Sequence, residues 1–334
     1  MTESEFTWRD GERTILFKEG AIADAPETLA AQGWDRYELL TTPRALADAP
    51  VQLLGQAGDV HEVPPGPVNE VAAALIDFVG ASSLVALGGG RVIDAAKAIA
   101  AVRGGRVAAL PTTLSGAEMT TIHRLPAGHS APHLIRPALV LADPLVMTSQ
   151  PRKELRASAM NALAHGADSL YTPLANPASK LTALDGAKRI ARSLDGSFDQ
   201  AGRTDLAIGS LLCAHALDSA LFSLHHVVCQ TLVRVMRIPH AETNAAILPR
   251  AMEAIRERDP ATIGELARAL GTKRDEIGPR IEKLAGGRRR LGKLGADKDK
   301  LERALNAMLD RGELGMTPDP PERDELRALV ESAW

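Results

Sequence analysis

Short apolar runs alternate with longer stretches of helical spacing through the first half of the chain. Runs of four apolar residues are short enough for strands that are buried on both faces. The predicted strands span 14–17, 37–40, 59–63, 84–87, 107–110 and 138–141, and the predicted helices between them span 21–32, 46–56, 68–80 and 92–102. This alternation predicts an α/β domain with a mostly parallel, doubly wound sheet.

The pattern changes near Pro151, after which no convincing strand is found. Proline and glycine separate most of the helical runs that follow. These runs span 152–171, 177–194, 201–221, 224–236, 243–256, 260–270, 274–284, 298–309 and 322–333. We therefore predict an α/β domain over 1–151 and an all-helical domain over 152–334.

Composition excludes several classes of protein. With 45% hydrophobic and 24% charged residues, the chain is typical of a soluble globular protein, and a net charge of −3 gives no reason to expect nucleic acid or membrane as a partner. Only Cys213 and Cys229 are present, so we expect a reducing, cytoplasmic location. The acidic N-terminus does not resemble a signal peptide, and no run approaches the ~20 apolar residues of a membrane span.

A glycine triplet follows the most apolar predicted strand. Gly88, Gly89 and Gly90 allow a sharp bend, and the helix that opens after them directs free N–H groups outward, which suits a phosphate. Asp94 and Lys97 share one face of that helix, so the lysine could reach a bound ligand. Alternatively, the triplet is only a tight turn and the charged pair only a surface ion pair.

Hydroxyl groups follow two of the predicted strands at their carboxyl ends. One set is Thr41-Thr42-Pro43, and the other begins Pro111-Thr112-Thr113-Leu114-Ser115. In open α/β sheets this edge is where ligands bind. Both segments are therefore candidates for the same site as the glycine triplet.

Polar side chains interrupt apolar helices in the second half. Asn161 and His165 lie four apart on one helix face, His226 lies within another apolar run, and His240 comes just before a predicted helix. Clustered imidazoles serve either a divalent metal or proton transfer. A neutral amide is a poor ligand beside a carboxylate, so a metal site here would be short of charge.

Together these segments resemble the iron-containing alcohol dehydrogenase family, within the dehydroquinate synthase-like fold. The resemblance rests on four motifs and extends over nearly the whole chain, with the closest likeness to the maleylacetate reductase-like branch. The motifs are Gly88-Gly89-Gly90-x-x-x-Asp94-x-x-Lys97, Pro111-Thr112-Thr113 with Ser115-Gly116-Ala117-Glu118-Met119-Thr120, Asn161-Ala162-Leu163-Ala164-His165, and Pro239-His240-Ala241-Glu242-Thr243-Asn244.

The resemblance implies hydride transfer with NADH or NADPH, with residues 1–151 as the dinucleotide-binding domain and residues 152–334 as the catalytic and substrate domain. Carried over by position, the implied cofactor-binding residues are Thr41, Thr42, Pro43, Gly88, Gly89, Gly90, Asp94, Lys97, Thr112, Thr113, Leu114, Ser115 and Met119. The positions that bind metal in other members hold Asn161, His165, His226 and His240, which become the implied catalytic residues. Asn161 stands where metal-using members carry Asp, which fits a branch that is regarded as working without metal, although iron or zinc stays open.

Several residues depart from the branch around the implied substrate pocket. Gln230 replaces a histidine, Val233-Arg234 replaces a glycine pair, Arg250 replaces a histidine, and Arg91 replaces a small residue in the glycine turn. These departures leave the identity of the substrate open.

We therefore expect a homodimeric NAD(P)H-dependent reductase that acts on a carbonyl or an activated double bond of a small, anionic substrate. One of the three histidines would supply the proton, and a guanidinium would hold the substrate carboxylate. The candidate arginines are Arg124, Arg234, Arg237 and Arg250. Two alternatives are a metal-dependent alcohol dehydrogenase and a cofactor-binding protein that has lost its chemistry.

Overall fold

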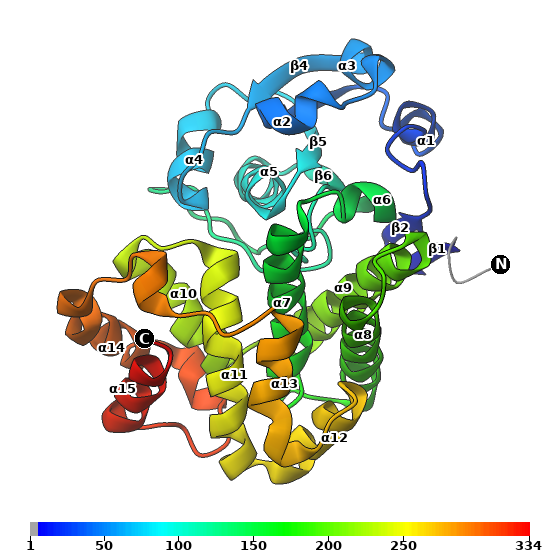
Figure 1. The fold of residues 1–334 in the computed structure, drawn as a ribbon. Coiled ribbons are helices and arrows are strands. Elements are labelled where there is room, and N and C mark those ends of the chain that lie inside the picture. Colours follow the sequence, from blue (N-terminus) through cyan, green and yellow to red (C-terminus); the bar gives the residue numbers. More distant parts are fainter. Residues whose placement is uncertain (1–5) are drawn as a thin grey trace. The chain divides into compact units, whose positions relative to one another are not determined.

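A seven-stranded sheet organises the first part of the chain in the computed structural model, which describes residues 6–334 (Figure 1). The strands are β1 (Phe6–Asp10), β2 (Arg13–Phe17), β3 (Tyr37–Thr41), β4 (Ala57–Glu62), β5 (Ser83–Gly88), β6 (Arg106–Pro111) and β7 (Leu139–Ala142). Their order is β1-β2-β7-β6-β5-β3-β4, and every neighbouring pair is parallel except the β1–β2 hairpin. The predicted, mostly parallel sheet is therefore confirmed.

Helices of this first unit (Met1–Gln150) bury both faces of the sheet. They are α1 (Ala25–Ala31), α2 (Pro43–Ala47), α3 (Val51–Gln56), α4 (Val68–Leu75), α5 (Gly90–Arg103) and α6 (Pro144–Met147). Strand β5 shows why its sequence is continuously apolar. Leu84 and Ala86 pack in a core with residues of α4 and α5, whereas Val85 and Leu87 pack in a second core with residues of α1 and α3.

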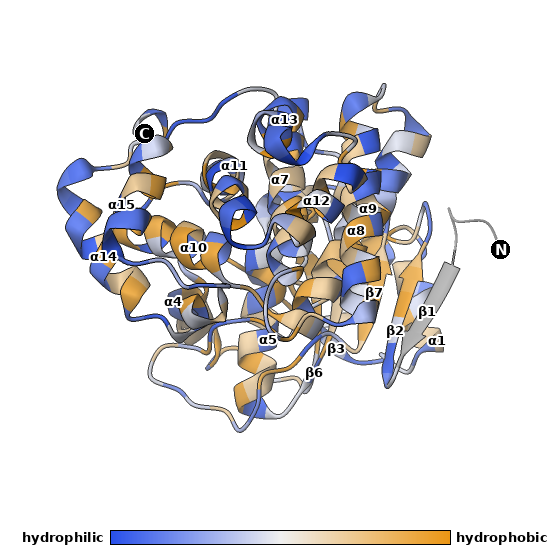
Figure 2. Cartoon of the chain, turned by 90° about the horizontal axis from the view of Figure 1, so that it is seen from below, coloured by the Kyte–Doolittle hydropathy of each residue, from blue (hydrophilic) through white to orange (hydrophobic). Residues whose placement is uncertain are grey.

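The second unit (Pro151–Trp334) is described over its whole length and contains no strand, which confirms the predicted all-helical half. Its α-helices are α7 (Arg152–Ser169), α8 (Pro177–Asp195), α9 (Gln200–Ala220), α10 (Leu224–Met236), α11 (His240–Arg258), α12 (Pro260–Ala269), α13 (Ile277–Leu284), α14 (Leu301–Leu309) and α15 (Arg323–Ser332). Short 3₁₀ turns are η1 (Arg274–Glu276), η2 (Leu291–Leu294), η3 (Lys298–Lys300) and η4 (Gly312–Met316). Hydrophobic residues run along α10, whereas α13 and α15 carry hydrophilic faces (Figure 2).

Small residues bring the central helices of this unit close together. A Cβ added to Gly186 of α8 would lie 2.6 Å from Sγ of Cys213 on α9, and one added to Gly166 of α7 would lie 2.7 Å from the same atom. A side chain on either glycine would force the Cys213 side chain or a neighbouring helix to shift. Helix α7, which carries two of the candidate site residues, is thereby fixed against α8 and α9.

Four local predictions differ from the structure. The hairpin strand β1 was not predicted, and neither was α6. The single helix predicted over 46–56 is wrong, because Pro50 separates α2 from α3 and Pro43 begins α2 with Thr42 as its N-cap. His240 does not precede a helix but is the first residue of α11.

No single helix within residues 6–334 is long and apolar enough to cross a membrane. Only α9 and α10 taken together reach that length and composition, and they are bent by 99° at their junction.

Candidate functional site

The glycine triplet forms a tightly packed turn between β5 and α5. A Cβ on Gly88 would lie 2.6 Å from Cγ2 of Val92, and one on Gly90 would lie 2.9 Å from Cβ of Ser115. Gly89 is the N-cap of α5 and has no side chain with which to cap it. The first N–H groups of α5 therefore lack the usual side-chain acceptor, and this end of the helix fits a phosphate group of a dinucleotide.

The loop after β6 packs directly on this turn. The backbone N–H of Thr112 donates to the carbonyl oxygen of Gly88 (3.0 Å), and Thr113 lies 3.1 Å from where a Cβ of Gly89 would be. Further along, the carbonyl oxygen of Met119 accepts from Nη1 of Arg13 (2.8 Å), and the Leu114 and Met119 side chains are fully buried. Thr112, Thr113 and Ser115 thus lie beside the glycine triplet, as the sequence motifs suggested.

The first threonine segment lies at the carboxyl end of β3, next to β5. The Thr41 hydroxyl donates to the carbonyl oxygen of Leu87 (2.9 Å), and the Thr42 hydroxyl accepts from the backbone N–H of Ala45 (3.3 Å). Both hydroxyls therefore have structural partners already. Their predicted contacts with a cofactor, and that of Pro43, stay predictions.

Lys97 is fully buried and has its own set of acceptors. Its ammonium donates to Oδ1 of Asp94 (2.8 Å) and to the carbonyl oxygens of Ala117 (3.0 Å) and Ile122 (3.1 Å). An ammonium has three N–H groups, so these bonds use all of them. The geometry gives Lys97 the task of holding the loop after β6 onto α5, and a cofactor contact for Lys97 and Asp94 stays a prediction.

Four predicted residues of the second unit lie together where α7, α10 and α11 pack. The rings of His165 and His226 stack with centroids 5.2 Å apart and planes 21° apart. Nδ2 of Asn161 lies 3.4 Å from Nε2 of His165, and its Oδ1 lies 3.2 Å from Nε2 of His240. Asn161, His165 and His226 are buried, whereas His240 is exposed, so the cluster extends from the surface into the core.

Burial keeps the inner imidazoles neutral. It lowers the pKa of His226 to about 3, with His240 and Arg311 adding to the effect, and it lowers the pKa of His165 well below its usual value. Nε2 of His226 and Nδ1 of His165 are buried and have no hydrogen-bond partner among the described residues. Buried polar atoms are rarely left unpaired, so these two nitrogens mark where a ligand group fits.

Sequence reasoning missed Asp168, which holds the other side of His226. Its Oδ2 lies 2.8 Å from Nδ1 of His226 and the residue is fully buried. Asp168 lies on α7, three residues after His165 and seven after Asn161, and therefore on the same helix face. A carboxylate in a run of small apolar residues, one turn beyond a candidate histidine, was the available signal.

These donors are a poor fit to a divalent metal ion. No three His, Cys, Asp or Glu side chains within residues 6–334 are grouped closely enough to hold one. Among the side-chain atoms of the four predicted residues that could bind a metal, only Oδ1 of Asn161 is an oxygen. This oxygen lies within hydrogen-bond distance of His240. The four side chains are also neutral as a set, and although three of them are imidazoles, these are not grouped closely enough to converge on one ion.

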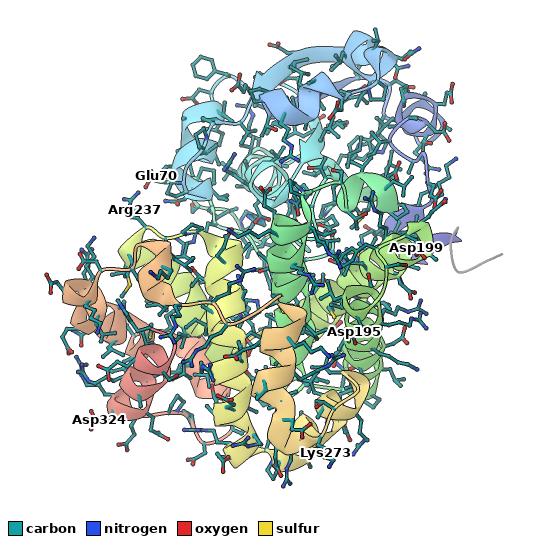
Figure 3. All side chains as sticks on the ribbon, viewed as in Figure 1. Glu70, Asp195, Asp199, Arg237, Lys273 and Asp324 are labelled. Carbon is teal, nitrogen blue, oxygen red and sulfur yellow. The ribbon has the colours of Figure 1, made fainter. Side chains whose placement is uncertain are left out.

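The predicted arginines lie in different surroundings. Arg250 forms ion pairs with Glu253 (2.9 Å) and with Glu282, which occupy its guanidinium. Arg124, Arg234 and Arg237 are exposed, and Figure 3 shows Arg237 at the surface beside the end of α10. Gln230, one of the departures from the branch, accepts a hydrogen bond from Nη1 of Arg311 (3.0 Å).

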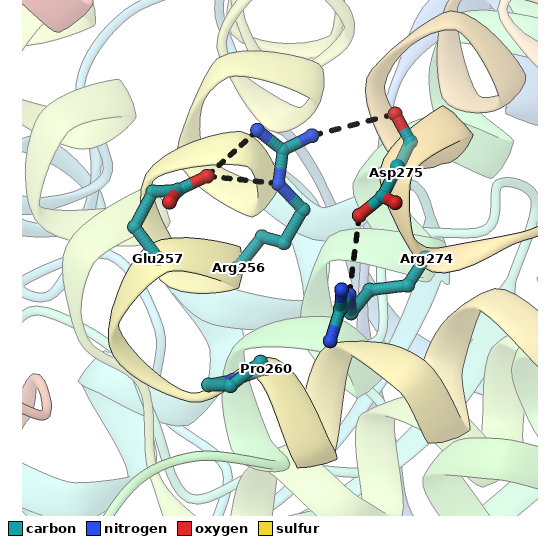
Figure 4. Close-up of a pocket in the computed structure, with 5 residues that line it drawn as sticks. All are labelled: Arg256, Glu257, Pro260, Arg274 and Asp275. Atoms are coloured by element: carbon teal, nitrogen blue, oxygen red, sulfur yellow. Dashed lines mark hydrogen bonds and ion pairs between the residues drawn. The ribbon is translucent and has the colours of Figure 1, made fainter.

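A separate surface pocket contains none of the predicted residues. It is lined by Arg256, Glu257, Pro260, Arg274 and Asp275 (Figure 4). Arg256 pairs with Glu257, and Arg274 pairs with Asp275, so the charges of this pocket are already matched. It is not a candidate for the dehydrogenase chemistry.

Two models of one protein family match most of the chain. Residues 12–144 match the family model for iron-containing alcohol dehydrogenase, and residues 156–334 match the C-terminal model of the same family. The chain belongs to the iron-containing alcohol dehydrogenase family, which confirms the resemblance seen in its motifs.

Within this family, several maleylacetate reductases are similar to the chain. The chain is 31% identical to maleylacetate reductase of Burkholderia cepacia over 96% of its own length and 95% of that protein. It is 37% identical to maleylacetate reductase 2 of Cupriavidus pinatubonensis over 64% of its length and 62% of that protein. The crystal structure of maleylacetate reductase from Agrobacterium tumefaciens superposes with a TM-score of 0.84 at 27% identity, covering 98% of this chain and 97% of that one. The chain is thus an NAD(P)H-dependent oxidoreductase that resembles maleylacetate reductase.

Proposed function

We propose that this protein uses NADH or NADPH to reduce a carbonyl or an activated double bond of a small dicarboxylate of the maleylacetate class, and that it needs no metal. The observation that carries the proposal is the buried His226. Asp168 holds one of its nitrogens and the other has no partner among the described residues. The names of the similar reductases support the substrate class.

The chain's residues divide the work between its two units. When bound, the reduced nicotinamide supplies the hydride. The turn at 88–90 and the first N–H groups of α5 hold the cofactor's phosphates. In the second unit, Nδ1 of His226 is committed to Asp168, so any proton that the ring exchanges with the substrate or product passes through Nε2. His165, Asn161 and His240 form the polar wall that polarises the reacting group in place of a metal.

Exposed arginines on α10 support an anionic substrate. Arg234 lies in the last turn of α10 and Arg237 is its C-cap. Both are exposed, and no ion pair joins either of them to another described residue. A guanidinium that is not neutralised by a carboxylate can bind a substrate carboxylate through two parallel hydrogen bonds.

A cytosolic location and a homodimeric state complete the proposal. Cys213 and Cys229 are free and buried, as is usual for thiols in a reducing compartment. Analytical ultracentrifugation of the purified protein would test the dimer, and a single species with the mass of one chain would contradict it.

The loss of nicotinamide absorbance tests the proposed reaction. The protein is dialysed against a chelator and mixed with NADH or NADPH and either maleylacetate or a panel of uncharged aldehydes and ketones. We expect turnover with maleylacetate before any metal is added. Turnover that appears only with added Fe²⁺ or Zn²⁺ would instead support a metal-dependent alcohol dehydrogenase. Cofactor binding without turnover on any substrate would support a protein that has lost its chemistry.

A further inference from the structure

We propose that Asp168 is a positioning residue that fixes the proton of the His226 imidazole on Nδ1, so that Nε2 faces the ligand as a bare acceptor for an alcohol or enol hydroxyl. The proposal deepens the proposed function and rests on it for the identity of the reaction. Its evidence is the set of contacts around one carboxylate.

The hydrogen bonds to Oδ2 of Asp168 determine the tautomer. This oxygen accepts from the backbone N–H groups of Ser223 (2.9 Å) and His226 (3.2 Å), and it lies 2.8 Å from Nδ1 of His226. The three backbone N–H groups and the Tyr171 hydroxyl that donate to Asp168 favour its ionised form, and a carboxylate can only accept. Nδ1 of His226 must therefore be the donor, and a neutral ring then has no proton on Nε2.

The same carboxylate also fixes the backbone of His226. Ser223 is the N-cap of α10, but its side chain does not cap the helix, because Oγ instead bonds the carbonyl oxygen of Glu313 (3.0 Å) and Oγ1 of Thr317 (2.5 Å). Asp168, which lies on α7, caps α10 instead, because its carboxylate accepts hydrogen bonds from the backbone N–H groups of Ser223, His225 and His226. A carboxylate at a helix N-terminus is favoured by the helix dipole.

Neighbouring rings restrict the orientation of the imidazole further. His165, Phe222 and His225 lie with their ring centroids 5.2, 5.4 and 5.0 Å from that of His226. Leu221, which precedes Phe222 in the chain, has φ 58° and ψ −163°. This backbone conformation costs a non-glycine residue on the order of 1–3 kcal/mol. The corner between α9 and α10 is therefore held in a strained form that the contacts to Asp168 help to maintain.

The tautomer selects the chemistry of the group that Nε2 can bind. A bare Nε2 accepts a hydrogen bond and cannot donate one. A hydroxyl of an alcohol or an enol satisfies it, whereas a ketone oxygen or a carboxylate does not. A neutral His226 is therefore complementary to the hydroxyl form of the substrate or product.

Nitrogen NMR on ¹⁵N-histidine-labelled, chelator-treated full-length protein tests the tautomer without any activity measurement. The signals of His226 are assigned by their loss in His226→Gln. We expect a protonated Nδ1 and a bare Nε2 in the wild type, and a mixture of tautomers in Asp168→Ala. A wild-type His226 that carries its proton on Nε2 would overturn the proposal, and this holds even if Asp168→Ala does not fold or the protein reduces no substrate.

Kinetics separate positioning from a purely structural role. Asp168→Ala should lower kcat about 100-fold with the Kd for NADH changed less than about twofold, because the variant loses the group that orients His226 and fixes its tautomer but keeps the proposed cofactor turn. Asp168→Asn should restore most of kcat, since its amide oxygen can occupy the place of Oδ2. Ser223→Ala is the matched control, because it disturbs the same helix end but keeps every contact to Asp168. A wild-type kcat in Asp168→Ala, or an equal loss in Ser223→Ala, would overturn the proposal.

Discussion

Replacing Glu118 with glutamine should remove a specific pH dependence from the stability of the protein. Glu118 is fully buried in the loop after β6, where the Ser115 hydroxyl lies 3.4 Å from Oε2 and Oε1 has no hydrogen-bond partner among the described residues. Burial raises the pKa of this carboxyl from 4.5 to about 7, although the ammonium of Lys97 opposes the effect. The folded protein therefore favours the protonated, neutral form.

The sign and size of the effect follow from linkage. Between pH 4.5 and about 7 the unfolded chain has lost this proton and the folded protein still holds it, so stability falls as the pH rises through that range. The two pKa values differ by about 2.5, and each unit corresponds to about 1.4 kcal/mol, so the contribution is on the order of 3 kcal/mol. Glutamine is neutral throughout and should not show this loss.

Urea unfolding at about pH 5 and about pH 8 measures the difference. We expect Glu118→Gln to match the wild type at the lower pH and to exceed it at the higher pH. The control is Glu70→Gln, the same substitution at an exposed site on α4, which should change neither midpoint appreciably (Figure 3). A difference between Glu118→Gln and the wild type that does not change with pH would refute the reasoning.

Two further predictions concern the proposed cofactor turn. Gly90→Ala should weaken NADH binding about tenfold, because the new Cβ would lie 2.9 Å from that of Ser115 and push the adjoining loop away, whereas Gly55→Ala, which meets nothing within 4 Å, should bind normally in the same fluorescence titration. Equal affinities would show that the packing of this turn does not matter. Lys97→Met should lower the free energy of unfolding by about 3–5 kcal/mol, since it removes a fully buried ammonium and leaves its three acceptors unpaired. Lys18→Met, at a partly exposed ion pair, should cost no more than about 1 kcal/mol, and similar urea midpoints for the two lysine variants would contradict this.

Hydrophobic patterning was sufficient to predict the sheet and the main helices. The apolar runs of β5 and β6 belong to strands buried on both faces, and the helix over 224–236 was predicted with the bounds of α10. The hydrophobic pattern gave wrong predictions where a single proline or a contact with another strand decides the structure. Pro50 divides a continuous helical pattern into α2 and α3, and the hairpin strand β1 exists through its pairing with β2.

The candidate site shows a similar limit. Spacing within one helix placed Asn161 and His165 on the same face, but it could not show that the distant His226 stacks on His165. The sequence did not identify Asp168 as a site residue, because its contacts are with another helix. They are made to backbone N–H groups and to the His226 ring at the start of α10. Such contacts depend on how helices pack, which a single sequence does not specify.

The most direct test of the account compares His226→Ala with His225→Ala. The two histidines are adjacent and almost equally buried, and each has one paired and one unpaired ring nitrogen. They differ in their partners, because His225 bonds the amide Oδ1 of Asn244 (2.7 Å), whereas His226 bonds Asp168 and stacks on His165 of the candidate site. With maleylacetate and NADH, we predict that His226→Ala loses turnover at least about 100-fold while it still binds NADH, and that His225→Ala retains at least about tenfold more turnover. Wild-type turnover in His226→Ala would contradict the central role given to this imidazole.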